Sequence, residues 1–263
     1  LLGDELGLGR LEHLHALGEA GALLLDRLHL GAGVGELVRG ALGRPEGDIP
    51  LAQAHVVTRL PLSNAWQQYL PEMTPITDLE GLQNFINLET LDLSNHAVTD
   101  ISPLQELTKL TTLSLAGNPV ADVSPLKGLT KLKVLMLSGS KAQDYSVLSN
   151  LVNLQVLMLE NSTISDLTPL AGLTNLKRLD LSDTPANDIS PLKDLRLQAL
   201  LLNNSRVKDL GPIRAMPLKE LEIANTRVFT FDALRSLSLV RLNLANTQFS
   251  DLSTLRDMPL REL

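Results

Sequence analysis

The feature that most constrains this sequence is a leucine pattern that returns every 21 or 22 residues. Apolar residues spaced as Leu-x-x-Leu-x-Leu occur at 88–93 and recur seven more times, and a ninth copy begins at Leu260. The second half of the unit also recurs, since the Asp-Ile-Ser-Pro-Leu sequence of 100–104 has close counterparts at 122–126, 166–170 and 188–192. A period of this length indicates a solenoid, in which each unit buries its apolar face only against its neighbours.

Each Leu-x-Leu pair indicates a short β-strand, because residues two positions apart point to the same face of an extended chain. Strands stacked ~4.8 Å apart form a parallel sheet over a continuous leucine core. The Ser/Thr-Pro-Leu segment indicates one tight helical or 3-10 turn, with Ser102 and its equivalents as the cap and the proline at the first position. The sequence therefore predicts an α/β solenoid with a parallel concave sheet and short turns on its convex side.

Together these motifs resemble the leucine-rich repeat family, and the Ser/Thr-Pro-Leu half resembles the short internalin-like repeats of bacteria. The resemblance runs from near Pro75 to the last residue and implies a horseshoe-shaped array. The family commonly carries an asparagine three residues after the last strand leucine, where its amide bonds neighbouring backbone. Asn118 alone keeps it, and hydroxyl groups can make some of the same bonds more weakly. The equivalent positions hold His96, Ser140, Ser162, Thr184, Ser205, Thr226 and Thr247.

The chain divides into a segment without repeats, residues 1–72, and an array, residues 73–263. The array contains 22-residue units over 88–175, 21-residue units over 176–259 and a truncated last unit over 260–263. Apolar residues at helical spacing from Leu14 to Leu28 favour a helical N-terminal cap, with a remnant of a preceding domain as the alternative. Trp66, Tyr69 and Phe85 are expected where the cap meets the array. The array stops without a polar cap, so we expect it to continue, to be covered by a partner, or to self-associate through this end.

Composition narrows the possible partners. A net charge of −7 and a pI near 5.3 do not suit a protein that neutralises phosphates, so we expect neither nucleic acid nor an anionic membrane as the main partner. The absence of cysteine excludes disulfides and thiol nucleophiles. No apolar run approaches the ~20 residues of a membrane span, and the first residues do not read as a signal peptide. Both a cytoplasmic location and secretion as an effector remain open.

The sequence offers little for catalysis. An aspartate recurs once per unit, and we expect it to cap a turn; a calcium ladder is the alternative, which one carboxylate per unit does not supply. His13, His15 and His29 are expected to be surface residues, because residues two apart do not face one way on a helix. We therefore expect no enzyme, no cofactor and no metal. The recurring aspartates are Asp100, Asp122, Asp144, Asp166, Asp188, Asp209 and Asp251, with Thr230 as the one break.

The residues that point away from the leucine core should line the concave face and bind a partner there. Around residues 134–158 they are valine and methionine, with charged residues at the edge and one leucine two units on. Exposed apolar patches usually mark an interface, and methionine suits adaptable contacts; sequence drift or cover by a flanking segment is the alternative. The predicted partner-binding residues are Val134, Met136, Val156, Met158, Glu160, Arg178, Asp180 and Leu201.

Three functions fit this pattern. The first is a non-catalytic protein–protein interaction module that binds another protein on its concave sheet. The second is a ligand-sensing domain of a larger bacterial signalling, defence or effector protein whose catalytic domain lies outside this chain. The third is a structural spacer. Bacterial proteins with similar repeats include surface adhesins, injected effectors and sensors, and the sequence does not choose among them.

Overall fold

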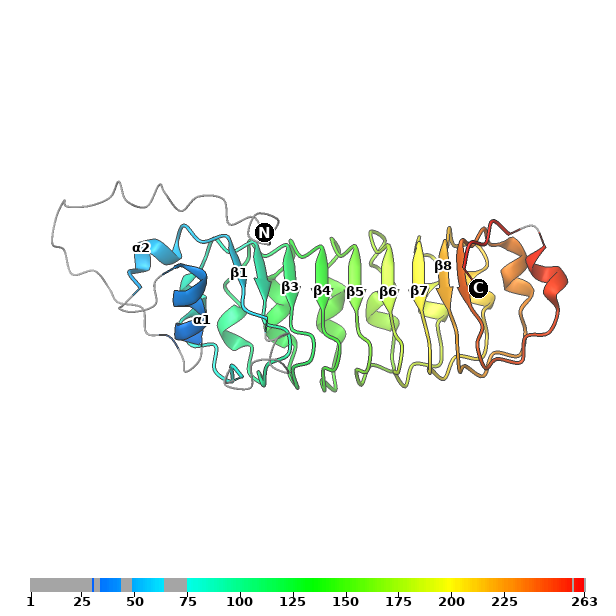
Figure 1. Cartoon of the computed structure of the whole chain (residues 1–263), viewed down its shortest axis with the longest axis horizontal. Helices are drawn as coiled ribbons and strands as arrows, with labels where there is room; N and C mark the ends of the chain where they lie inside the picture. The colour runs from blue at the N-terminus through cyan, green and yellow to red at the C-terminus, as the bar shows by residue number, and fades with distance from the viewer. Residues whose placement is uncertain (1–29, 31–33, 44–48, 64–74, 257, 263) are drawn as a thin grey trace.

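The computed structural model describes residues 30, 34–43, 49–63, 75–256 and 258–262. Among these residues, nine parallel strands form a single sheet in chain order and stand side by side along the long axis of the molecule (Figure 1). The register is constant, so that Leu91, Leu113 and Leu135 lie next to one another on successive strands. The strands are β1 (Arg59–Pro61), β2 (Thr90–Asp92), β3 (Thr112–Ser114), β4 (Val134–Met136), β5 (Val156–Met158), β6 (Arg178–Asp180), β7 (Ala199–Leu201), β8 (Glu220–Glu222) and β9 (Arg241–Asn243).

The predicted leucine core is confirmed. The strand leucines of the repeats are buried and form one continuous hydrophobic cluster with the apolar residues of the turns. The open sheet, in which each strand pairs only with its neighbours in the chain, follows from repeating the same unit side by side. The predicted leucine-rich repeat solenoid is therefore the fold of the chain.

A short 3-10 helix occupies the convex side of each unit, as the Ser/Thr-Pro-Leu motif predicted. The sequence predicted caps from both the serine and the recurring aspartate, and the structure shows how the two act together. The Oδ1 of Asp100 accepts the backbone N–H of Ser102 at 2.8 Å, and the Ser102 hydroxyl donates to the same carboxylate. The aspartate therefore caps the turn and the serine assists it. The helices are η2 (Leu82–Asn84), η3 (Ser102–Leu104), η4 (Ser124–Gly128), η5 (Ser146–Asn150), η6 (Thr168–Leu170), η7 (Ser190–Leu192), η8 (Gly211–Ile213), η9 (Asp232–Ser236) and η10 (Leu252–Leu255).

The recurring aspartates act as backbone caps throughout the array, which confirms the capping interpretation of this column. Each accepts the N–H of the residue two positions further on, and this bond satisfies a donor that the short helix leaves free. The aspartates that make it are Asp100, Asp122, Asp144, Asp166, Asp188, Asp209 and Asp251.

The N-terminal end of the sheet is covered by helix α1 (Val34–Ala41), and helix α2 (Leu51–Ala54) lies close by (Figure 1). Val34 and Val38 of α1 are fully buried in the same core as the leucines, so a helical cap is present. β1 also belongs to residues 1–72, and the sheet therefore begins inside this segment. Phe85 is fully buried, whereas Trp66, Tyr69 and the helix expected over 14–28 lie outside the described residues. The boundary at residue 72 stays a prediction.

A second repeated conformation, which the leucine pattern did not predict, follows each strand from β2 to β9. One residue per unit has a positive φ, which glycine and asparagine adopt more readily than other residues. At Gly117 (φ 72°) an added Cβ would lie 2.5 Å from the Oδ1 of Asn95, so a larger residue would have to displace that side chain in addition to adopting the positive φ. The column consists of Asn95, Gly117, Gly139, Asn161, Asp183, Asn204, Asn225 and Asn246.

The position of the family asparagine is occupied differently along the array. The amide of Asn118 accepts the N–H of Val98 and donates to the carbonyl of Leu93. His96 makes the equivalent pair of bonds one unit earlier, to the N–H of Ile76 (3.1 Å) and the carbonyl of Leu62 (2.6 Å). Because Nδ1 must accept, the proton sits on Nε2 and the ring is neutral. Burial lowers the pKa of His96 below its usual value.

The hydroxyl residues of this column differ among themselves. Thr184, Thr226 and Thr247 each donate to the carbonyl three residues earlier at 2.6–2.7 Å. The buried hydroxyls of Ser162 and Ser205 have no hydrogen-bond partner among the described residues. Threonine hydroxyls at this position therefore find a backbone hydrogen-bond partner, whereas only some of the serine hydroxyls find any partner.

The leucine core predicts a large effect of truncation in the middle of the sheet. Leu157 lies on β5 between Leu135 and Leu179 and is fully buried. Leu157→Ala is expected to lower the free energy of unfolding by ~2–5 kcal/mol, because a cavity remains in a row that cannot collapse. Urea unfolding measures this. Val152→Ala, at a site that is 48% exposed, is the control, and an equal effect of both substitutions would contradict the argument.

His96 predicts a pH dependence of stability. The folded chain holds its ring neutral and with a lowered pKa, so unfolding takes up a proton between the two pKa values and stability falls as the pH drops below about 6.5. His96→Asn restores the family residue and should reduce this loss between about pH 7.5 and 5. Urea unfolding at the two pH values measures it, with His55→Asn as the control. Identical pH profiles for the wild type and His96→Asn would refute the assignment.

Candidate functional site

The concave face brings together the four apolar residues predicted as a partner site. Parallel register places Val134 beside Val156 and Met136 beside Met158, on the adjacent strands β4 and β5. All four are half-buried and point away from the leucine core, since Leu135 and Leu157 occupy the alternate positions of the same strands. We call Val134, Met136, Val156 and Met158 the apolar patch.

The predicted edge residues are placed less uniformly. Glu160 is exposed, whereas Asp180 is 5% and Leu201 is 9% exposed. The Oδ1 of Asp180 accepts the N–H of Ser182 at 2.9 Å, so part of this carboxylate is used by its own backbone. Partial burial is the main cause of the raised pKa of Glu160, and repulsion from Asp180 and Asp183 raises it further. The edge of the patch on this side is therefore acidic.

Arg178 does not pair with the acidic residues next to it. Its guanidinium reaches across β7 to Glu220 on β8, with Nη1–Oε2 and Nη2–Oε1 distances of 2.7 and 3.1 Å. The residue between them in register is Ala199, which is 6% exposed and has no side chain large enough to block the path. Arg241 on β9 contacts Glu220 from the other side through Nη2. We call Arg178, Glu220 and Arg241 the arginine–glutamate cluster.

Burial in this cluster is uneven. The Glu220 side chain is 8% exposed, against 33% for Arg178 and 51% for Arg241. The hydrogen bonds from Arg178 outweigh burial and, with those from Arg241, hold the pKa of Glu220 below its usual value. The same bonds raise the pKa of Arg178. Two guanidinium groups are therefore held on one carboxylate.

The cluster forms the floor of a groove of about 550 Å³ that runs along the C-terminal half of the concave face. Three exposed cations stand along one side of this concave groove, and we call Lys177, Lys219 and Arg261 the basic rim. Glu220 and Glu262 are the two carboxylates of the lining, so its cations outnumber its anions by five to two. The sequence analysis placed Arg178 at the edge of the apolar patch and missed this arrangement.

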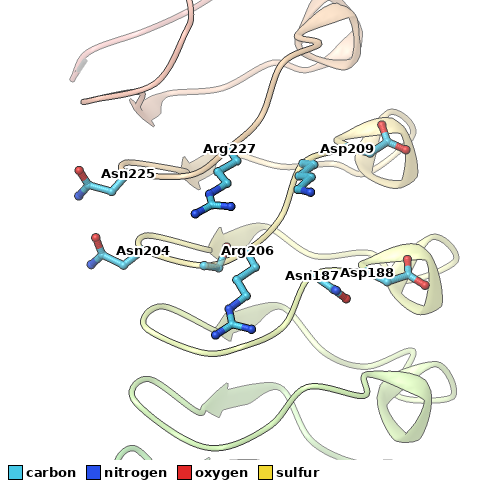
Figure 2. A pocket seen from close by; sticks show the side chains of 9 residues that line it. Asn187, Asp188, Asn204, Arg206, Asp209, Asn225 and Arg227 are labelled. Atoms are coloured by element: carbon cyan, nitrogen blue, oxygen red, sulfur yellow. The ribbon is translucent and has the colours of Figure 1, made fainter.

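A second hollow, of about 690 Å³, lies off the sheet, beside the loops that follow β6, β7 and β8 (Figure 2). Side chains of successive units lie one above another there, with Asn225 above Asn204 and Arg227 above Arg206. Asp188 and Asp209 lie on the other side of this hollow, where each accepts a hydrogen bond from a backbone N–H of its own turn. The signal in the sequence is an arginine at the same position of two successive units. We call Arg206, Lys208 and Arg227 the lateral cations, and all three are exposed.

In the part of the chain that the structure describes, no helix has the length and apolar character needed to cross a membrane. Among the same residues, no three histidine, cysteine, aspartate or glutamate side chains converge as metal ligands would.

Comparison with known proteins finds leucine-rich repeats in the middle of the chain. A family model described as leucine-rich repeats (2 copies) matches residues 108–150 and 152–194. No curated protein matches the sequence.

Solved structures similar to this chain include two proteins of Listeria monocytogenes. An internalin is 27% identical with a TM-score of 0.76, and the match covers 88% of this chain and 74% of that protein. An internalin C2 is 29% identical with a TM-score of 0.71, over 92% of this chain and 97% of that protein. A leucine-rich repeat protein of Leptospira interrogans, 22% identical with a TM-score of 0.62 over 81% of this chain and 61% of its own, shares the fold.

The arginine–glutamate cluster predicts an acid-sensitive contribution to stability. Glu220→Gln removes the charge that holds both arginines and should lower the free energy of unfolding by about 1–2 kcal/mol at neutral pH, a modest loss because the arginines are partly exposed. The lowered pKa of Glu220 means that this contribution is lost as the pH falls below about 4.5. Urea unfolding at pH 7 and in acid measures the difference, with Glu262→Gln as the control. A difference from wild type that is unchanged by pH would disprove the prediction.

Proposed function

We propose that this chain, an internalin-like leucine-rich repeat protein of the bacterial type, is a non-catalytic module that binds a partner protein on its concave face. The observation that carries the proposal is the apolar patch. Four valine and methionine side chains lie together on the solvent side of β4 and β5. Apolar side chains gathered at one place on a surface favour association with another protein, because burial removes their area from water.

The position of the patch supports the proposal. It lies in the middle of the sheet, where neighbouring strands hold the backbone on both sides, so a partner would meet side chains of fixed spacing. Charged and polar side chains surround it, including Glu160 and Asp180 on one side. An apolar centre with a polar rim is the usual composition of an interface.

Other units of this chain indicate that the patch is not required for folding. At the position of Met136 and Met158 the other repeat units carry aspartate, serine, glutamate or asparagine, such as Ser114 on β3 and Asn243 on β9, except that β7 carries Leu201. The fold accepts polar side chains there. The fold therefore does not require valine and methionine at these positions of the two adjacent units.

The test removes the methionines without adding charge. Met136→Ser together with Met158→Ser uses the residue that Ser114 already provides in the same column, and should lower the free energy of unfolding by no more than about 1–2 kcal/mol. Pull-down from a lysate of the source organism, read by quantitative mass spectrometry, should show partners that the wild type captures and this variant does not.

The matched control truncates two side chains of the same region that are off the concave face. Gln143→Ser together with Val152→Ser changes exposed residues of one of the same units and should leave the captured partners unchanged. Equal capture by the methionine variant and the wild type would reject the apolar patch as the binding surface. So would equal losses in the methionine variant and the control.

A further inference from the structure

We propose that the concave groove between β6 and β9 binds an acidic, extended segment of the partner protein that presents a carboxylate at every third residue. The proposal rests on the function proposed above, since it names the partner chemistry for another part of the same face. It is carried by three observations: the sign of the charge in the groove, the way in which its arginines are held, and the spacing of its basic rim.

The charge of the groove is opposite to that of the whole chain. The chain carries a net charge of −7, yet five cations and two carboxylates line this groove. Lys177, Lys219 and Arg261 are exposed and make no ion pair among the described residues. Unpaired like charges repel one another, and a bound carboxylate relieves this repulsion. Local charge of this kind selects an anionic partner.

The arginines at the floor are held before any partner arrives. Glu220 fixes Arg178 by two hydrogen bonds and Arg241 by a third. A guanidinium group has five N–H donors in a rigid fork that matches a carboxylate, and Glu220 uses only part of this capacity. The Arg241 side chain is half exposed, which leaves it accessible from the groove. Side chains that are already ordered lose less conformational entropy on binding.

The basic rim has a regular spacing. Lys177 comes directly before β6, and Lys219 comes directly before β8, two strands later. Arg261 occupies the same position one unit after β9, because its backbone N–H donates to the carbonyl of Val240, the residue before β9. Neutral residues, Gln198 and Val240, stand at the other positions of this column. Since strands are ~4.8 Å apart, cations on alternate units recur about every 9–10 Å.

This spacing selects the conformation of the bound segment. A polyproline II helix has three residues per turn and rises ~3.1 Å per residue, so one face presents every third side chain at ~9.3 Å. A β-strand presents every second side chain at ~6.7 Å, which does not match the rim. A segment in the polyproline II conformation therefore places successive carboxylates opposite successive cations of the rim.

The surroundings of the groove favour a short acidic segment over a long polyanion. Asp180 lies on β6 at the opposite end from Arg178, and Glu160 and Asp183 follow β5 and β6 on that side of the sheet. A nucleic acid strand broad enough to cover the sheet would come near these carboxylates. A narrow peptide can follow the basic rim without reaching them.

The experiment uses the full chain and a fluorescent peptide of three Glu-Pro-Pro units, with binding followed by fluorescence anisotropy at several salt concentrations. The wild type should bind it, more weakly as salt rises. The triple variant of the basic rim, Lys177→Gln with Lys219→Gln and Arg261→Gln, should bind about tenfold more weakly, as expected for the loss of three surface ion pairs.

The matched control removes the same charge from the other hollow. Arg206→Gln with Lys208→Gln and Arg227→Gln lowers the net charge equally in the same half of the array but off the sheet (Figure 2). Its affinity should stay within about twofold of the wild type, because screening weakens the effect of distant surface charges. Equal weakening in both triple variants would overturn the proposal, since net charge alone would then explain binding.

A second peptide tests the spacing. It has the same composition, with its three glutamates adjacent, and should bind the wild type more weakly than the Glu-Pro-Pro peptide. Equal binding of the two peptides, no binding of either, or stronger binding of a single-stranded oligonucleotide would overturn the proposal.

The two proposals fail independently. The Met136→Ser/Met158→Ser variant should keep its affinity for the peptide, because the apolar patch lies on β4 and β5 outside the groove. If the peptide does not bind while the methionine variant loses its captured partners, the partner chemistry inferred here is wrong and the proposed function stands. If the peptide binds as expected and the methionine variant captures the same partners as the wild type, the apolar patch is not the binding surface and the inferred partner chemistry stands.

Discussion

The whole molecule depends on one constraint, which is that a three-residue strand can bury its leucine only against the next copy of itself. Leu135, Leu157 and Leu179 are fully buried because each has a leucine on both sides in parallel register. This requirement sets the period, the register and the single sheet together. It also fixes the concave face, since every residue between two core leucines is turned outward by the alternation of the strand.

Stacking identical units leaves many backbone N–H and C=O groups that the hydrogen bonds between strands do not pair. Two kinds of side chain in the repeat form hydrogen bonds with them. Aspartates such as Asp100 and Asp188 close the 3-10 turns of the convex side by accepting an N–H two residues away. Asn118 and His96 bridge backbone groups of neighbouring units on the other side. The polar columns of the repeat are thus structural, and function must be sought among residues that the units do not share.

The concave face contains two regions of that kind. In the middle, the apolar patch places valine and methionine where every other repeat unit except that of β7 is polar. Toward the C-terminal end, the arginine–glutamate cluster and the basic rim form a cationic groove in an acidic chain. A partner with an apolar contact and an acidic tail would use both. The two regions are neighbours because β5 and β6 are, so one partner can reach them without any change in the array.

The sequence by itself determined the solenoid, the parallel sheet, the 3-10 turns and the adjacency of Val134, Met136, Val156 and Met158, because a strict repeat converts position in the unit into position in space. It predicted caps from both the aspartates and the serines, but it did not determine that the aspartate accepts the backbone N–H while the serine hydroxyl donates to the aspartate. Nor did it reveal the pairing of Arg178 with Glu220. That contact passes over Ala199, between strands two apart, and depends on how far a side chain reaches and which way it turns. Periodicity specifies where a Cα lies, but only the folded array decides which long side chains meet.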